Sequence, residues 1–291
     1  MDITKYLDTW AAAYRNDLIE NIMPFWMKFG LDRKHGGIYT CLDRDGKLMD
    51  STKSVWFQGR FGFIASYAYN HIEKKQEWLA ASKSCIDFIE THCTDIDGHL
   101  FFEVTEEGIP LRKRRYVFSE CFAAIAMSEY AIASGDKNYA TKALEMFKRI
   151  LKFLSTPGFL EPKYLPTLQS RGHSITMILI NTASRIREVI EDPIRQYFMH
   201  PEFKALLEMV GPKGELIDTC NGRTINPGHC IETSWFIMEE ARHRNWDKDL
   251  VQLALQILDW SWEWGWDKEY GGIINFRDCK NFPPQDYSQD M

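Results

Sequence analysis

Two stretches of this sequence decide its fold: Gly30-Leu31-Asp32-Arg33-Lys34-His35-Gly36-Gly37-Ile38-Tyr39 and Gly265-Trp266-Asp267-Lys268-Glu269-Tyr270-Gly271-Gly272-Ile273-Ile274. Both begin with glycine, carry aspartate at the third position and end in a Gly-Gly pair followed by isoleucine. Each follows an aromatic segment that contains tryptophan. Internal similarity of this kind predicts a repeat architecture.

The spacing of further glycines gives the length of the repeat. Gly98 and Gly214 head similar strand-like runs, and a degraded copy is predicted near Gly158. Gly36 to Gly98 is 62 residues, Gly98 to Gly214 is 116 and Gly214 to Gly271 is 57. One unit is therefore about 59 residues, which suits a short glycine-led hairpin followed by two helices.

Helical periodicity fills the intervals between these glycines, because apolar residues recur at steps of three and four. The predicted helices are Val55–Tyr69, Trp78–Ile89, Phe118–Ala133, Ala140–Leu154, Ile175–Ile190, Cys230–Ala241 and Leu250–Trp264. Ser119 is predicted to precede one helix, and Asn226-Pro227 places a capping residue before proline at the start of another. Neither strand–helix alternation nor a GxGxxG motif occurs, which disfavours a Rossmann sheet.

These patterns predict an all-α protein, an (α/α)6 toroid or barrel of helix pairs with short β-hairpins between them. Six units would need about 350 residues by the repeat length. The 291 residues hold about five. We therefore expect a single domain over 1–291 that has about nine of the twelve helices and lacks the final ones.

Charge and cysteine content narrow the function classes. The net charge is −6, and no Lys/Arg run is longer than Arg112–Arg115, so nucleic acid and acidic membranes are not expected partners. The seven cysteines form no CxxC motif, which indicates reduced thiols and a cytoplasmic location. No signal peptide and no apolar run long enough to cross a bilayer is found.

Two segments carry candidate chemistry. Arg60 lies in the aromatic run Val55–Phe61, where a guanidinium needs a partner or a polar cavity; it either stabilises an oxyanion or bridges to a core carboxylate. His229 lies in the first turn of a helix, whose positive end favours a neutral imidazole that accepts protons. Glu232, three residues on, shares its face and either orients His229 or binds a substrate hydroxyl. Alternatively, His229 caps a loop and Glu232 lies on the solvent side. HExxH is absent and no third ligand is evident, so no metal is expected.

Together these segments resemble the N-acylglucosamine 2-epimerase family, also known as renin-binding protein. The resemblance rests on Pro24-Phe25-Trp26, Gly36-Gly37, Trp56-Phe57-Gln58-Gly59-Arg60, Tyr116-Val117-Phe118-Ser119-Glu120-Cys121-Phe122-Ala123 and Pro227-Gly228-His229-Cys230-Ile231-Glu232. It implies an (α/α)6 barrel, a sugar substrate, a homodimer and epimerisation at C2 between N-acetylglucosamine and N-acetylmannosamine. No cofactor is required for that reaction; ATP modulates some members, although no P-loop occurs here.

By this resemblance His229 is a catalytic histidine, Arg60 stabilises the enediolate, Glu232 is a site carboxylate and Tyr116 contacts the substrate. Family members continue beyond this length and carry a second catalytic histidine there. His173 is the spare candidate for that second acid.

Three alternatives stay open. Relatives epimerise other aldoses or cellobiose, but the H-x-H pair of the cellobiose type is absent from Ile175–Asn181, which favours an N-acylhexosamine. The second alternative is a remnant of the family that binds sugar or dimerises without turnover. An inverting glycosidase that uses Glu103, Glu120 or Asp218 is the third.

Overall fold

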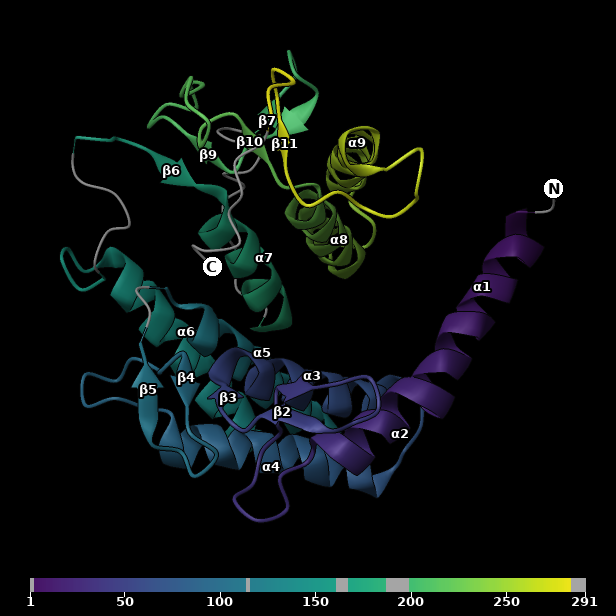
Figure 1. Ribbon diagram of the computed structural model, residues 1–291, viewed down its shortest axis with the longest axis vertical. Helices are drawn as coiled ribbons and strands as arrows, with labels where there is room; N and C mark the ends of the chain where they lie inside the picture. The colour runs from purple at the N-terminus through teal and green to yellow at the C-terminus, as the bar shows by residue number, and fades with distance from the viewer. Residues whose placement is uncertain (1–2, 114–115, 161–166, 187–198, 284–291) are drawn as a thin grey trace. The chain divides into compact units, whose positions relative to one another are not determined.

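The computed structural model describes residues 3–113, 116–160, 167–186 and 199–283, and helices dominate it (Figure 1). The chain divides into two compact units, residues 1–161 and 162–291. The single domain over 1–291 stays a prediction.

The first unit begins with a helical run in which π-helical turns interrupt the α-helix. Its helical segments are α1 (Ile3–Asp17), η1 (Leu18–Ile22), α2 (Met23–Phe25), η2 (Trp26–Gly30), α3 (Val55–His71), α4 (Gln76–His92), α5 (Phe118–Ser134) and α6 (Lys137–Ser155). Helix α3 packs against both α4 and α5, and α5 packs against α6. Figure 1 shows these four helices lying side by side.

Short antiparallel strands join the helices of the first unit. They are β1 (Cys41–Leu42), β2 (Leu48–Asp50), β3 (Lys53–Ser54), β4 (Glu103–Val104) and β5 (Pro110–Arg112). Strand β1 pairs with β2, and β4 lies between β3 and β5, with Lys53 opposite Val104.

The second unit has the same plan of helices and very short strands. Its elements are β6 (Arg171–Gly172), α7 (His173–Ile186), β7 (Met199–His200), β8 (Ala205–Leu206), β9 (Met209–Val210), β10 (Thr224–Ile225), α8 (Pro227–His243), α9 (Lys248–Gly265) and β11 (Arg277–Asp278). The antiparallel pairs are β6–β9, β7–β8 and β10–β11. Helices α8 and α9 pack together over a core that includes Leu206, Val210, Ile237 and Ile257.

Each helix predicted from periodicity is present, and the ends differ by a few residues. The predicted end of one helix, 187–190, lies outside the described residues. Asn226 caps α8 as expected, since its Oδ1 accepts a hydrogen bond from the His229 amide at 3.1 Å. The prediction for Ser119 was wrong: α5 begins at Phe118, and the Ser119 hydroxyl donates to the carbonyl of Phe101 instead of capping the helix.

The two similar stretches adopt the same hairpin. In the first, Asp32 N donates to Gly37 O and Tyr39 N donates to Gly30 O. In the second, Asp267 N donates to Gly272 O and Ile274 N to Gly265 O. The Gly-Gly pair has positive φ in both copies, a conformation that glycine adopts without steric cost.

The surroundings of the two hairpins differ. The Gln58 side chain accepts a hydrogen bond from Ile38 N at 2.8 Å and donates one to Ile38 O at 2.6 Å. Ser84 Oγ accepts from Gly37 N at 2.9 Å. Ile38 also packs in a hydrophobic cluster and is 2% exposed, whereas its counterpart Ile273 is 38% exposed.

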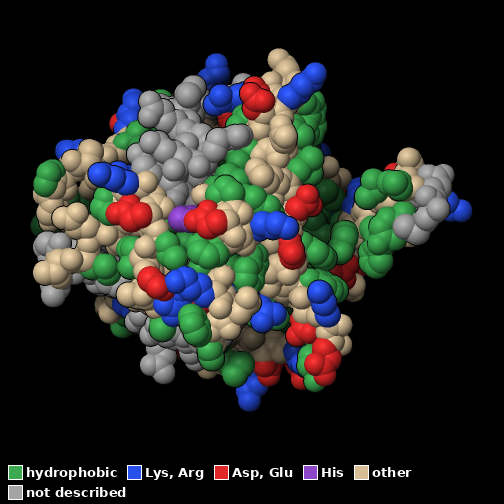
Figure 2. All heavy atoms as spheres, turned by 90° about the horizontal axis from the view of Figure 1, so that it is seen from above, with side chains coloured by type: hydrophobic (Ala, Val, Ile, Leu, Met, Phe, Trp, Pro, Cys, Tyr) green, Lys and Arg blue, Asp and Glu red, His purple; other side chains and the backbone are tan. Residues whose placement is uncertain are grey.

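Helix α1 is amphipathic and buries no residue. Figure 2 shows hydrophobic side chains gathered on it, and its exposed apolar residues are Ile3, Tyr6, Leu7, Trp10 and Tyr14. Among the described helices, none combines the length and apolarity that a membrane span requires.

Candidate functional site

The segment around Arg60 brings together an arginine and several aromatic rings in the first unit. The Arg60 guanidinium carbon lies 4.3 Å from the centre of the Phe122 ring on α5 and 5.7 Å from that of Phe57. An arginine stacked in this way lays its guanidinium plane over the ring and points its N–H groups away from the ring face. The stacking therefore orients Arg60 without neutralising its charge.

Glycine at position 59 makes this arrangement geometrically feasible. A Cβ on Gly59 would lie 2.6 Å from the backbone carbonyl carbon of Phe122, which is closer than van der Waals contact allows. Only glycine lets α3 and α5 approach so closely, and this approach brings Phe122 under Arg60. Within the motif Trp56–Arg60, the glycine is therefore required for helix packing.

Trp56 completes an aromatic surface beside Arg60. Its ring stacks on Phe118 at 5.1 Å between centroids and meets Phe102 edge-on at 5.1 Å. Tyr116 packs edge-on against Phe118 at 6.2 Å. We call these residues together with Phe122 and Arg60 the Arg60 cluster. Trp56, Phe102, Tyr116 and Phe118 are partly exposed, and aromatic faces beside polar donors are suited to a ring with hydroxyl groups.

The second unit holds the predicted histidine. His229 is the third residue of α8, and its side chain is 28% exposed. Its Nδ1 lies 3.1 Å from Glu208 Oε1. The same oxygen lies 3.4 Å from Nδ1 of His173, the first residue of α7. A single carboxylate therefore joins both histidines.

Glu208 was not among the residues predicted from sequence. Its burial would raise the pKa of the carboxyl, but the adjacent His229 and His173 outweigh burial and hold the pKa well below its usual range. The group is consequently an anion at neutral pH. The signal that could have revealed it is a charged residue within the apolar run Ala205–Val210.

The other two residues predicted in this unit, Glu232 and His173, differ in exposure. Glu232 is exposed, and the Glu208 carboxylate lies within hydrogen-bond distance of His229. The roles considered for Glu232 stay predictions. The His173 side chain is 0% exposed, and its Nε2 lies 3.1 Å from Thr233 Oγ1. With Nδ1 on Glu208 and Nε2 on Thr233, this ring faces protein groups on both sides.

The three carboxylates considered for glycoside hydrolysis belong to separate structural contacts. Glu120 is fully buried and accepts hydrogen bonds from His99 Nδ1 and Leu100 N. Asp218 pairs with Arg223 and Lys280, and Glu103 accepts from the Thr52 hydroxyl. The hydrolytic role considered for these three residues stays a prediction.

One group of described side chains has the composition of a metal site. Ligand atoms of Asp32, His35 and Glu106 lie within 4.8 Å of one another. However, the Lys53 ammonium lies 2.7 Å from Asp32 Oδ2 and 2.8 Å from the carbonyl oxygen of Glu106. Lys53 already supplies the positive charge that this position needs.

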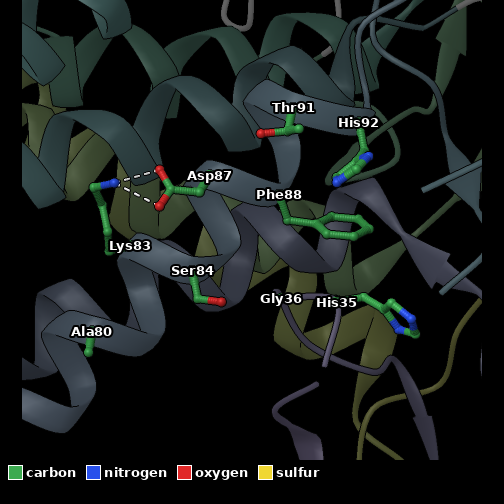
Figure 3. Close-up of a pocket in the computed structure, with 9 residues that line it drawn as sticks. All are labelled: His35, Gly36, Ala80, Lys83, Ser84, Asp87, Phe88, Thr91 and His92. Atoms are coloured by element: carbon green, nitrogen blue, oxygen red, sulfur yellow. Dashed lines mark hydrogen bonds and ion pairs between the residues drawn. The ribbon is translucent and has the colours of Figure 1, made fainter. Parts of the chain in front are cut away.

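A shallow pocket of about 420 Å³ lies near this group (Figure 3). It is lined by His35, Gly36, Ala80, Lys83, Ser84, Asp87, Phe88, Thr91 and His92. None of the predicted site residues lines it. Lys83 and Asp87, which form an ion pair one turn apart on α4, are each at least 36% exposed. Ser84 accepts a hydrogen bond from the glycine hairpin.

Comparisons with known proteins agree with the motifs. The family model for N-acylglucosamine 2-epimerase matches residues 37–290. N-Acylglucosamine 2-epimerase of Rattus norvegicus is 28% identical over 304 residues, which cover 98% of this chain and 72% of the rat protein. Cellobiose 2-epimerase of Ruminococcus albus is 31% identical over 143 residues, which cover 48% of this chain and 36% of that protein.

Among solved structures, cellobiose 2-epimerase from Bacillus thermoamylovorans superposes with a TM-score of 0.79 at 20% identity. The match covers 93% of this chain and 76% of that one. Similarity at this level shows the fold, and the (α/α)6 class predicted from the repeat is confirmed. The helix pairs joined by short hairpins are the units of that fold.

Proposed function

Because this chain belongs to the N-acylglucosamine 2-epimerase family, we propose that it interconverts N-acetylglucosamine and N-acetylmannosamine by moving the proton at C2. The relatives with that name match almost the whole chain, whereas the cellobiose 2-epimerase of Ruminococcus albus matches about half of it in sequence. The absence of the H-x-H pair supports the same choice of substrate. The observation that carries the proposal is His229, held at the start of α8 by an ionised carboxylate.

The reaction follows from the acidity of C2 in the open-chain sugar. The lone pair of neutral His229 takes the C2 proton, and the electron pair of the C–H bond forms the C1–C2 double bond while the carbonyl oxygen becomes an enolate oxygen. We propose that Arg60 stabilises that negative oxygen, and that Glu232 and Tyr116 bind the sugar. Return of a proton to the opposite face of C2 completes the epimerisation.

The acid that returns the proton must reach C2. The fully buried ring of His173 is contacted on both nitrogens by Glu208 and Thr233. We therefore propose that His173 supports Glu208 and do not assign it the second acid.

We also propose, from the family resemblance, that the protein is a homodimer, acts in the cytoplasm with reduced cysteines and needs no cofactor. ATP as a modulator is a further proposal of the same origin. Sedimentation velocity tests the dimer. Turnover of dialysed protein with and without ATP tests whether a cofactor is needed and whether ATP modulates the activity.

Isotope exchange tests the activity directly. N-Acetylmannosamine is incubated with the protein in heavy water, and deuterium at C2 is followed by proton NMR together with formation of N-acetylglucosamine. We expect deuterium at C2 and formation of N-acetylglucosamine. His229→Asn should slow both by at least about 100-fold, as for removal of a general base. The matched control is His243→Asn, which changes an exposed histidine at the end of the same helix.

The outcomes separate the alternatives. Exchange with cellobiose but not with N-acetylmannosamine would indicate the cellobiose type. Sugar binding without any exchange would indicate a binding remnant. Hydrolysis of a glycoside that survives His229→Asn would indicate a carboxylate-driven glycosidase.

A further inference from the structure

We propose that Glu208 is a positioning residue that fixes His229 in the tautomer with hydrogen on Nδ1, so that Nε2 carries the lone pair that accepts the C2 proton. The inference rests on the proposed function for the identity of that proton, but the tautomer itself is a property of the free protein. Nothing in the family motif that includes His229 and Glu232 points to Glu208, which lies 21 residues before His229.

The backbone holds Glu208 at a junction of three segments. Its amide donates to the Thr224 carbonyl at 3.0 Å, and its carbonyl accepts from the His173 amide at 3.0 Å. Glu208 is thereby tied to the start of α7 and to β10, the strand that leads into α8. Its neighbours Leu207 and Met209 are buried at 0% and 8% exposure, so the position of the carboxylate is set by packing as well as by hydrogen bonds.

The proton assignment follows from the chemistry of the partners. An ionised carboxylate only accepts hydrogen bonds, so the Nδ1 of His229 must donate, and the lone pair of the neutral ring is left on Nε2. When Nε2 takes up a proton, the imidazolium lies 3.1 Å from an anion that stabilises it. The same division of roles operates between aspartate and histidine in serine-protease triads.

The second histidine makes the arrangement rigid. His173 contacts the same Glu208 oxygen, and its Nε2 contacts Thr233 Oγ1, which also donates to the His229 carbonyl at 2.9 Å. The contacts thus form a closed ring that starts and ends on α8, and we call Glu208, His173, Thr233 and His229 the Glu208 network. The His229 imidazole is held through Glu208, whose carboxylate is itself contacted by His173, and a carboxylate fixed in this way preorganises the ring that it contacts.

Among the described residues, the ionisable groups that face His229 in this unit include Glu208, from the segment before β9, and, through it, His173 from α7. The buried thiol of Cys230 follows His229 on α8; burial raises its pKa and the Glu208 charge raises it further, so the thiol stays neutral. The anion next to His229 is therefore the charge expected to set its titration.

Glu208→Gln tests the assignment because it removes the charge and keeps the shape. Without the anion the imidazolium is less stable, so the acidic limb of the pH profile of kcat/KM should move to lower pH by about one unit or more. The amide can also donate to Nδ1 and select the wrong tautomer, so kcat should fall between about tenfold and 10⁴-fold. KM should change little, because Glu208 acts through His229.

Glu202→Gln is the matched control, since Glu202 accepts from His200 Nδ1 at 2.9 Å in the same unit but outside the Glu208 network. Its pH profile should equal that of the unaltered protein. Glu208→Asp keeps the charge, so it should lower kcat while leaving the acidic limb near its original pH. An acidic limb that stays in place in Glu208→Gln would overturn the inference.

Imidazole nitrogen chemical shifts separate this inference from the proposed function. In the unaltered protein without sugar we expect His229 to show hydrogen on Nδ1. Hydrogen on Nε2 instead would overturn the inference, whether or not any variant folds. Hydrogen on Nδ1 in a protein that exchanges no sugar proton would support the network and refute the proposed function.

Discussion

Replacement of Lys53 by methionine should destabilise the first unit strongly. Lys53 is 0% exposed, and its ammonium donates to Asp32 Oδ2 at 2.7 Å, to Gly36 O at 2.8 Å and to Glu106 O at 2.8 Å. Methionine retains the packing of the side chain but leaves a buried carboxylate without its cation. The loss of one partner of a buried pair costs about 3–5 kcal/mol, which urea denaturation followed by tryptophan emission measures.

A double variant separates the charge from the packing. In Lys53→Met with Asp32→Asn the buried charge is gone, while the amide oxygen can still accept from the backbone amides of Lys34 and His35. We expect it to regain about 1–3 kcal/mol relative to Lys53→Met. A single variant that loses less than about 1 kcal/mol, or a double variant no more stable than the single one, would refute the reasoning.

The pH dependence of stability gives an independent measure of the ion pair between Asp32 and Lys53. Burial alone would raise the pKa of Asp32, but Lys53 and the backbone amides of His35 and Lys34 lower it from 3.8 to about 2. A carboxyl whose pKa is lower in the folded state stabilises that state above the unfolded pKa. This contribution, about 2.5 kcal/mol, should therefore be lost as the pH falls from 4 towards 2, and the difference between the unaltered protein and Lys53→Met should shrink over the same range.

Gly59→Ala should lower the free energy of unfolding by about 1–3 kcal/mol, because its methyl group would collide with the backbone of α5. Gly62→Ala is the milder control, since its Cβ would meet a side chain at 3.3 Å. Equal urea midpoints for the two variants would contradict the prediction. Asn226→Ala should lose about 1 kcal/mol by removing the cap of α8, and C2 exchange should slow with it; unchanged stability would show that the cap is dispensable. Iodoacetamide should label Cys41 and Cys220, which are exposed, before the five buried thiols, and mass spectrometry that finds uniform labelling of folded protein would refute this order.

The helices and hairpins were predictable because they depend on local signals. Apolar spacing located the helices, and paired glycines located the turns, since positive φ is a requirement of the backbone itself. Ser119 shows where local reasoning fails. Its hydroxyl can accept from a helix N–H as a cap or donate to the Phe101 carbonyl, and only the tertiary structure brings that carbonyl within 3.1 Å.

The candidate site was predictable only in part. Arg60 and His229 stood out by residue type in an unusual setting, whereas Glu208 becomes meaningful only when β9 and α8 are brought together. The same argument that marked Arg60, a charge in an apolar run, applies to Glu208, whereas buried Lys53 lies in the polar run Ser51–Ser54 and gives no such signal. Partners of long sequence separation, such as Lys53 and Glu106 or His173 and Thr233, follow from topology and not from motif spacing.

The glycine hairpin also has a use in protein engineering. Residues 265–274 repeat the backbone hydrogen bonds of residues 30–39, and in the first copy the amide of Gln58 binds both polar groups of Ile38. A designer could therefore treat residues 37–92 as a transferable module and graft a copy onto the hairpin at Gly272. The Gln58 equivalent would meet Ile273, and each added copy would lengthen the array by one helix pair.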